Sequence, residues 1–128
     1  MNDKELLRAA LKAREKAYTP YSHYHVGAAL LTKSGRVFTG ANVENASYGL
    51  SVCAERVAAF HAVSEGEREF AAIAVVTENG VTPCGACRQV LSEFGPDMRV
   101  IVGDTHGNSR EYGIRDLLPD FFTPADLK

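Results

Sequence analysis

Two largely apolar runs, each placed after a segment with a helical pattern, constrain the fold of this chain more than any other feature. The runs AAIAVVT (71–77) and MRVIVG (98–103) are typical of strands that are covered on both faces. Segment 53–63, rich in Ala, Glu and Arg, precedes the first run, and segment 84–94 precedes the second. We therefore expect two tandem helix–strand units.

The rest of the chain predicts one more long helix and a hairpin. A helix capped at Asn2 runs towards Pro20, which stops it. The apolar runs 26–32 and 36–43 flank a turn and are typical of a β-hairpin, and a short strand and a short helix follow within 111–118. Strands that alternate with helices predict an α/β fold, a three-layer α/β/α sandwich with a mixed central sheet of about five strands. The order of the strands stays open.

Length and composition restrict the class of function. We expect one domain over residues 1–128, because the chain is long enough for one core. Fourteen basic against sixteen acidic residues leave a net charge of -2, so we expect no polynucleotide partner. The N-terminal segment lacks the apolar centre of a signal peptide, and no stretch is long enough to cross a bilayer. We therefore expect a cytoplasmic protein with no membrane partner.

Three cysteines, an odd number, carry the strongest chemical signal. Cys84 and Cys87 form a Cys-x-x-Cys pair whose spacing suits tetrahedral zinc, although a thioredoxin-like dithiol or two buried core cysteines fit the pair equally well. Cys53 begins another predicted helix, and the carboxylate of Glu55 follows two residues later. Together these residues match the pattern of zinc deaminases, with Cys in place of His.

Three cysteine ligands leave the fourth position of a zinc ion for water, which is typical of a catalytic site, and we expect one Zn²⁺ per chain. In the first turn of a helix, Glu55 can take a proton from the attacking water, pass it to a ring nitrogen and protonate the departing amine. Three thiolates leave the site with a charge near −1. Arg88 directly follows Cys87, and Arg56 directly follows Glu55. Both can offset that charge, with Arg56 preferred, and an exposed arginine with a surface ion pair is the alternative for each.

The chain resembles the small, homotetrameric cytidine deaminases along almost its whole length. The resemblance is carried by PYSHYHVGAAL (20–30), NVENASYG (42–49), CAER (53–56), PCGACRQ (83–89) and LLPDFF (117–122). It implies hydrolytic deamination of cytidine and 2′-deoxycytidine to uridine and 2′-deoxyuridine in pyrimidine nucleoside salvage. The implied partners are a small nucleoside and further copies of the chain in a homotetramer.

The resemblance also implies roles in substrate binding. Asn42 and Glu44, which a solvated turn explains about as well, match residues that hydrogen-bond the ribose hydroxyls. Tyr24 stands where the family commonly carries Phe beside the pyrimidine, so the ring is kept and a hydroxyl is added. Ala54 of CAER is counted with the substrate-binding residues.

Tyr48 and Phe122 match family positions that reach into the site of a neighbouring subunit, although both fit core aromatics equally well. Other functions stay open. A deaminase of an aminoacyl-nucleoside antibiotic such as blasticidin S would share the zinc chemistry, and NVENASYG argues against it. The remaining alternatives are a protein braced by zinc without catalysis and a dithiol redox protein.

Overall fold

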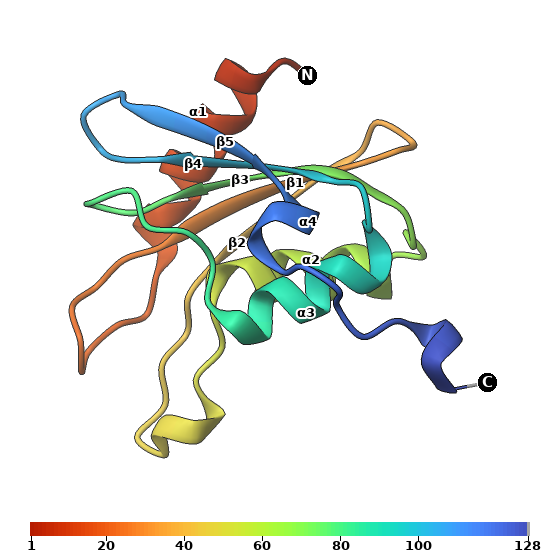
Figure 1. The fold of residues 1–128 in the computed structure, drawn as a ribbon. Helices are drawn as coiled ribbons and strands as arrows, with labels where there is room; N and C mark the ends of the chain where they lie inside the picture. The colour runs from red at the N-terminus through yellow and green to blue at the C-terminus, as the bar shows by residue number, and fades with distance from the viewer. Residues whose placement is uncertain (128) are drawn as a thin grey trace.

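A five-stranded sheet lies between two layers of helix in the computed structural model, which describes residues 1–127 (Figure 1). The helices are α1 (Asp3–Ala13), α2 (Ala54–Ser64), α3 (Gly85–Phe94) and α4 (Ile114–Leu117). The strands are β1 (Gly27–Thr32), β2 (Val37–Ala41), β3 (Phe70–Val76), β4 (Arg99–Gly103) and β5 (Ser109–Gly113). Short 3-10 turns cover Arg14–Lys16, Tyr48–Leu50 and Pro124–Leu127.

The strand order is β2-β1-β3-β4-β5. Strands β3 and β4 are parallel because helix α3 connects them as a crossover, and the other neighbours are antiparallel. Helix α1 covers one face of the sheet, and α2 and α3 cover the other (Figure 1). The predicted three-layer α/β/α sandwich with a mixed five-stranded sheet is therefore confirmed, together with the hairpin, which is β1–β2.

Glycines in two neighbouring strands let helices lie directly against the sheet. A Cβ atom at Gly40 of β2 would come within 2.6 Å of the Ala54 carbonyl oxygen at the start of α2. A Cβ atom at Gly27 of β1 would come within 2.0 Å of the Ala10 carbonyl oxygen in α1. Both distances are too short for any side chain, so Gly40 determines how closely the first turn of α2 approaches the sheet.

Two helices begin one residue later than the pattern predicts. The backbones of Cys53 and Cys84 are extended, and each residue is the N-cap of its helix. Their carbonyl groups already accept the first helical hydrogen bonds. Helix α1 has the predicted capping box between Asn2 and Glu5, but its α-helical part ends at Ala13, well before Pro20. The N-cap positions of the two cysteines bear directly on the site.

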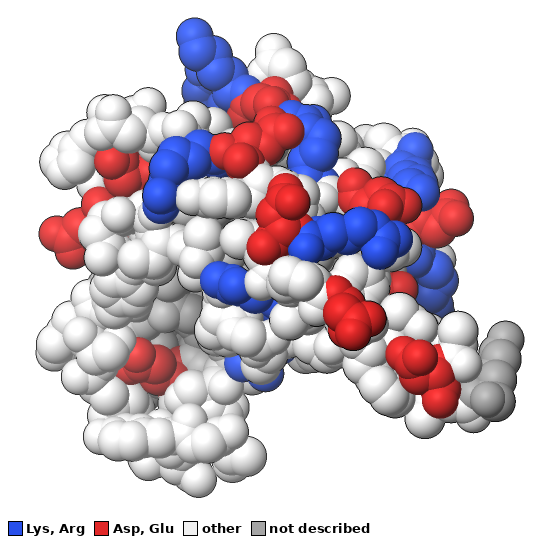
Figure 2. All heavy atoms as spheres, viewed as in Figure 1, with Lys and Arg blue, Asp and Glu red and all other residues white. Residues whose placement is uncertain are grey.

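The charged side chains are spread unevenly over the surface. Figure 2 shows basic and acidic groups interspersed over the upper part of the molecule, whereas the lower left is nearly uncharged. The two loops that project there, 17–26 and 42–52, contain Glu44 as their one charged residue among Lys, Arg, Asp and Glu. In residues 1–127 we find no helix with the length and apolar character needed to cross a membrane.

Candidate active site

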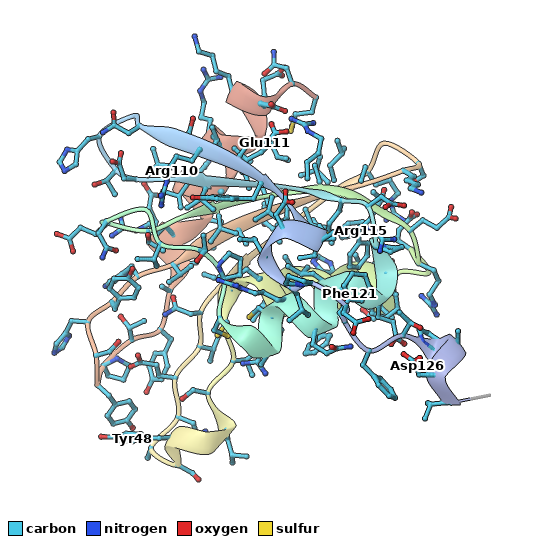
Figure 3. All side chains as sticks on the ribbon, viewed as in Figure 1. Tyr48, Arg110, Glu111, Arg115, Phe121 and Asp126 are labelled. Carbon is cyan, nitrogen blue, oxygen red and sulfur yellow. The ribbon has the colours of Figure 1, made fainter. Side chains whose placement is uncertain are left out.

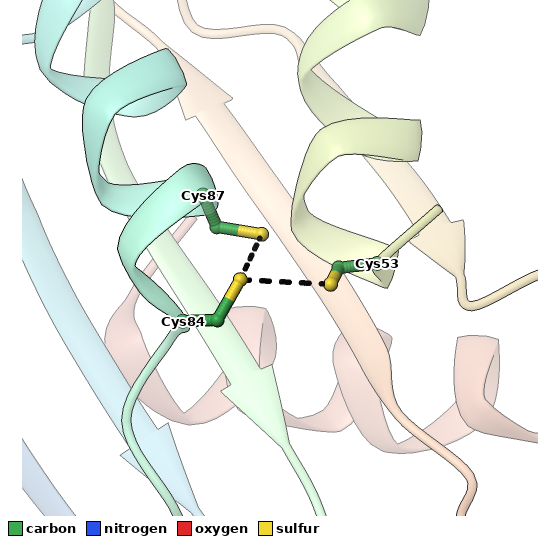
Figure 4. Close-up of side chains that lie close together, drawn as sticks. All are labelled: Cys53, Cys84 and Cys87. Carbon is green, nitrogen blue, oxygen red and sulfur yellow. Dashed lines mark hydrogen bonds between the residues drawn. The ribbon is translucent and has the colours of Figure 1, made fainter. Parts of the chain in front are cut away.

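Three sulfur atoms meet where the N-termini of α2 and α3 converge (Figure 4). The Cys53 and Cys84 sulfurs are 3.7 Å apart, and the Cys84 and Cys87 sulfurs are 3.5 Å apart. All three lie within 4.8 Å of one another. The prediction that two helix starts bring the cysteines together is confirmed. Such helix starts stabilise thiolates through their free N–H groups and the positive ends of their dipoles.

The sulfur cluster has the dimensions of a tetrahedral zinc site. Zn–S bonds of about 2.3 Å in tetrahedral geometry separate two sulfurs by about 3.8 Å. The separations of 3.5 and 3.7 Å are close to this value, so the cysteines fit a zinc ion with little movement. No His, Asp or Glu of residues 1–127 completes the group to four ligands. Three sulfurs without a fourth protein ligand are the donor set of an open site.

Hydrogen bonds among the sulfurs shift the pKa values of the cysteines in opposite directions. The Cys87 thiol is the main cause that lowers the pKa of Cys53 to about 5, and Arg56 and Cys84 add to the effect. The pKa of Cys87 is raised, because its proton is held against the Cys53 sulfur and the side chain is buried. One thiolate therefore forms easily and retains a neighbouring proton, which a metal ion must displace.

Arg56 contacts the cysteine cluster directly. Its Nη2 donates to the Cys53 sulfur at 3.5 Å, and this bond is the main reason that the pKa of Arg56 is raised. Its Nε is buried and has no hydrogen-bond partner within the described residues. The contact with Cys53 supports the predicted compensation of thiolate charge.

Arg88 serves another purpose. Its guanidinium donates to the Pro83 carbonyl at 2.7 Å, the Leu117 carbonyl at 2.6 Å and the Thr82 hydroxyl at 2.9 Å. All three nitrogens thus bind groups that flank α3 rather than the sulfurs. Of the two arginines considered for offsetting the thiolate charge, Arg88 therefore ties the start of α3 to α4, and Arg56, the preferred one, contacts a cysteine sulfur.

Glu55 lies in the first turn of α2, directly after the Cys53 cap. Its side chain is buried, with 4% of the residue exposed, and faces the same pocket as Cys53 and Cys84. Burial raises the pKa of Glu55 to about 7, the Cys53 charge adds to the rise, and Arg56 opposes it. A carboxyl group that exchanges its proton near neutral pH is suited to general acid–base chemistry.

A pocket of ≈ 300 Å³ opens over these groups. Its walls combine polar side chains with a few valines from β3 and from two loops. The lining residues are Ser22, Tyr24, Val26, Asn42, Glu44, Cys53, Glu55, Val75, Thr77, Val81, Thr82 and Cys84. This size suits a small molecule. A metal-binding cluster and a buried carboxyl therefore face one small-molecule pocket.

Comparison with known proteins identifies the family. A family model described as the cytidine and deoxycytidylate deaminase zinc-binding region matches residues 1–104, which is most of the chain. This chain belongs to the cytidine and deoxycytidylate deaminase family. The expectation drawn from its motifs is confirmed.

Individual relatives agree with this assignment. A cytidine deaminase of Halalkalibacterium halodurans is 53% identical, and the match covers 99% of this chain and 98% of the relative. A crystal structure of cytidine deaminase from Burkholderia pseudomallei is 54% identical and superposes with a TM-score of 0.92, covering 95% of this chain and 100% of its own. A blasticidin-S deaminase of Bacillus cereus is only 32% identical, over 94% of this chain and 92% of its own.

Asn42 of this deaminase has a structural task besides any contact with substrate. Its Oδ1 accepts the Val26 amide at 2.9 Å, and its Nδ2 donates to the Tyr24 carbonyl at 2.8 Å. A primary amide has two donor hydrogens and two acceptor lone pairs, so one of each remains available. Asn42 lines the pocket, and its predicted contact with ribose stays a prediction.

Glu44 likewise holds the loop that precedes β1. Its carboxylate accepts the amides of Tyr21 and Ser22, each at 3.1 Å, and the Ser22 hydroxyl. The Ser22 hydroxyl is the main cause that keeps the pKa of Glu44 below its usual range. Glu44 is therefore an ionised acceptor at the pocket edge, and its role towards the sugar also stays a prediction.

The remaining predicted residues are divided between the pocket and the surface. Tyr24 lines the pocket, and its hydroxyl lies 2.5 Å from Asn79 Oδ1. Ala54 is fully buried at the start of α2 and is not among the lining residues. Tyr48 and Phe122, 72% and 53% exposed, lie outside the pocket, and Tyr48 sits at the tip of a loop that projects away from the sheet (Figure 3).

Sequence reasoning missed part of the pocket wall. Thr77 is 1% exposed at the end of β3, and Val81 and Thr82 follow it in the loop before α3. The position of Thr77 at the carboxyl end of a buried strand is a usable signal, because sites in α/β sheets gather there. Val81 and Thr82 carry no such signal, since only the path of the loop brings them to the site.

Proposed function

We propose that this deaminase converts cytidine and 2′-deoxycytidine to uridine and 2′-deoxyuridine with release of ammonia, in pyrimidine nucleoside salvage. The observation that carries the proposal is the buried carboxyl of Glu55 facing the same pocket as the three-cysteine cluster. Relatives named cytidine deaminase that match nearly the whole chain support the choice of nucleoside.

In this proposal Cys53, Cys84 and Cys87 hold one zinc ion per chain. When bound, zinc supplies a Lewis acid that lowers the pKa of a water in the remaining position. Glu55 takes a proton from the attacking water and delivers it to N3 of the pyrimidine. The water oxygen bonds to C4, and as the C4–N4 bond breaks, Glu55 carries a second proton from the new C4 hydroxyl to N4, so that the amine leaves as ammonia. Arg56 offsets the charge of the thiolates.

The other pocket residues position the nucleoside. Asn42 retains one donor and one acceptor for a ribose hydroxyl, and the Glu44 carboxylate accepts from another. Tyr24, which lines the pocket, packs beside the pyrimidine. Ala54 is buried behind the lining residues and is kept as a substrate-binding residue on the family resemblance alone. The few charged groups of this wall suit a neutral nucleoside.

The experiment that tests this function is deamination of cytidine followed by ultraviolet absorbance, repeated after chelation and after zinc is restored. We expect turnover in the untreated protein, loss after chelation and recovery with about one zinc per chain. Turnover unaffected by full removal of zinc would contradict the mechanism. Faster turnover of blasticidin S than of cytidine would favour an antibiotic deaminase. A protein that holds no zinc and whose cysteines exchange disulfides would favour a dithiol redox function.

We infer that the protein works as a homotetramer in which Tyr48 and Phe122 reach into neighbouring sites. The nearly uncharged loops 17–26 and 42–52 support self-association, because they expose apolar side chains to solvent: Tyr18, Tyr21, Val43, Tyr48 and Leu50. Light scattering is expected to give four times the 13.9 kDa chain mass, and Leu50→Glu is expected to give smaller species. A monomer fully active towards cytidine would exclude shared sites.

A further inference from the structure

Two loops from distant parts of the chain contribute to the pocket wall. Loop 17–26 contributes Ser22 and Tyr24, and loop 77–82 contributes Thr77 and Thr82. The phenolic oxygen of Tyr24 lies 2.5 Å from the side-chain oxygen of Asn79, which is a direct hydrogen bond between the two loops. We propose that this bridge between Tyr24 and Asn79 sets the width of the pocket for the substrate, so that Tyr24 acts as a positioning residue through its hydroxyl.

The loop that carries Tyr24 is held firmly at its backbone. The Tyr24 amide donates to the Ser22 hydroxyl at 3.0 Å, and the Tyr24 carbonyl accepts from Asn42. Between them, His23 has φ 58°, a left-handed conformation that residues other than glycine rarely adopt. The surrounding hydrogen bonds impose this conformation. The phenol therefore extends from a fixed backbone towards loop 77–82.

The loop that carries Asn79 is anchored on its other side. The Thr77 hydroxyl accepts the amides of Gly80 and Val81 at 2.8 and 3.1 Å. The Gly80 carbonyl accepts from Nη2 of Arg110 on β5 at 2.8 Å. These bonds tie the loop to the sheet, whereas the bond from Tyr24 to Asn79 ties it to loop 17–26. Asn79 does not itself line the pocket, so the bond acts on the wall through Tyr24 and through the neighbouring Thr77, Val81 and Thr82.

The hydroxyl and the ring of Tyr24 have separate tasks in this proposal, which rests on the proposed function. The ring contacts the base, and the hydroxyl fixes the wall before substrate arrives. Groups that preorganise a pocket for bound substrate and transition state alike change KM rather than kcat. Loss of one neutral hydrogen bond corresponds to about a two- to tenfold effect. We therefore expect the bridge to appear in KM.

The test compares Tyr24→Phe, Asn79→Ala and the double variant in cytidine deamination by the zinc-loaded enzyme. Each single variant is expected to raise KM about two- to tenfold with kcat within about twofold of wild type. The double variant is expected to raise KM no more than the more strongly affected single variant does, because all three lack the same bond. Asn79→Asp, which keeps an acceptor oxygen, is expected to retain the wild-type KM.

Tyr112→Phe is the matched control, because it removes a hydroxyl from a partly buried tyrosine on β5, which is not among the pocket-lining residues. Unchanged KM in both single variants overturns the proposal, and so do KM effects that multiply in the double variant. Amide hydrogen exchange over residues 78–82 gives a readout that needs no substrate. Tyr24→Phe and Asn79→Ala are expected to speed it, and Tyr112→Phe is not.

The exchange measurement separates failure of the bridge from failure of the proposed function. A wild-type protein that deaminates no pyrimidine nucleoside contradicts the proposed function, whereas faster exchange in both bridge variants still supports the link between the loops. Unchanged exchange in these variants, in an enzyme that deaminates cytidine normally, contradicts the bridge alone.

Discussion

Glu55→Gln is expected to lower kcat for cytidine by about 10²- to 10⁴-fold while the protein keeps its zinc. The amide has nearly the same size as the carboxyl group, so the buried first turn of α2 should stay intact. It cannot accept and return a proton, however, and the proposed reaction needs that transfer more than once. We expect the loss towards the upper end of the range, measured by ultraviolet assay alongside zinc analysis.

The control for this variant is Glu93→Gln, the same chemical change at an exposed position of α3. Its kcat and zinc content are expected to equal those of wild type. A Glu55→Gln protein that retains zinc and full turnover would remove Glu55 from the mechanism. Loss of zinc from Glu55→Gln would instead give this residue a role in building the metal site.

Cys87→Ala is expected to reduce bound zinc from about one ion per chain to almost none and to reduce turnover to background. Cys87 is completely buried, and its sulfur lies 3.5 Å from that of Cys84. The variant leaves two sulfurs of three and a small cavity behind them, so both metal affinity and packing decrease. Elemental analysis after dialysis against a weak chelator measures the first effect directly.

Ser92→Ala is the matched control, since Ser92 is a buried residue of similar size on the same helix. Its hydroxyl donates to the Gln89 carbonyl and does not approach the sulfurs. This variant is expected to keep zinc and activity. If Cys87→Ala also retains a full zinc equivalent after dialysis, the three-cysteine site is refuted.

The elements of the fold were predictable because their patterns are local. The apolar runs 71–77 and 98–103 correspond to β3 and β4, and the helices before them are α2 and α3. The insertion of β1 between β2 and β3 was not predictable, since it depends on which edge of the hairpin the third strand finds. The early end of α1 at Ala13 also has no local signal, because helical spacing continues beyond it.

The site, like the fold, was predictable only where a local pattern in the sequence determines the geometry. The convergence of Cys53, Cys84 and Cys87 was predicted from the Cys-x-x-Cys spacing together with the match of Cys53 and Glu55 to the zinc-deaminase pattern, and the two helix starts supply the geometry. The contrast between Arg56 and Arg88 was only partly predictable, since each follows a cysteine and only the packing of α4 draws Arg88 away. Contacts that form between distant loops, such as Tyr24 with Asn79, leave no pattern in the sequence.

The close contact of Gly40 with the first turn of α2 has a consequence for how this enzyme tolerates change. Cys53 and Glu55 occupy one end of α2, whereas Cys84 and Cys87 belong to α3. A substitution that displaces α2 moves the first pair as a unit and separates it from the second. Substitutions at this contact are therefore expected to weaken zinc affinity before they disturb proton transfer by Glu55. In a directed-evolution library, such variants would lose activity first when zinc is scarce.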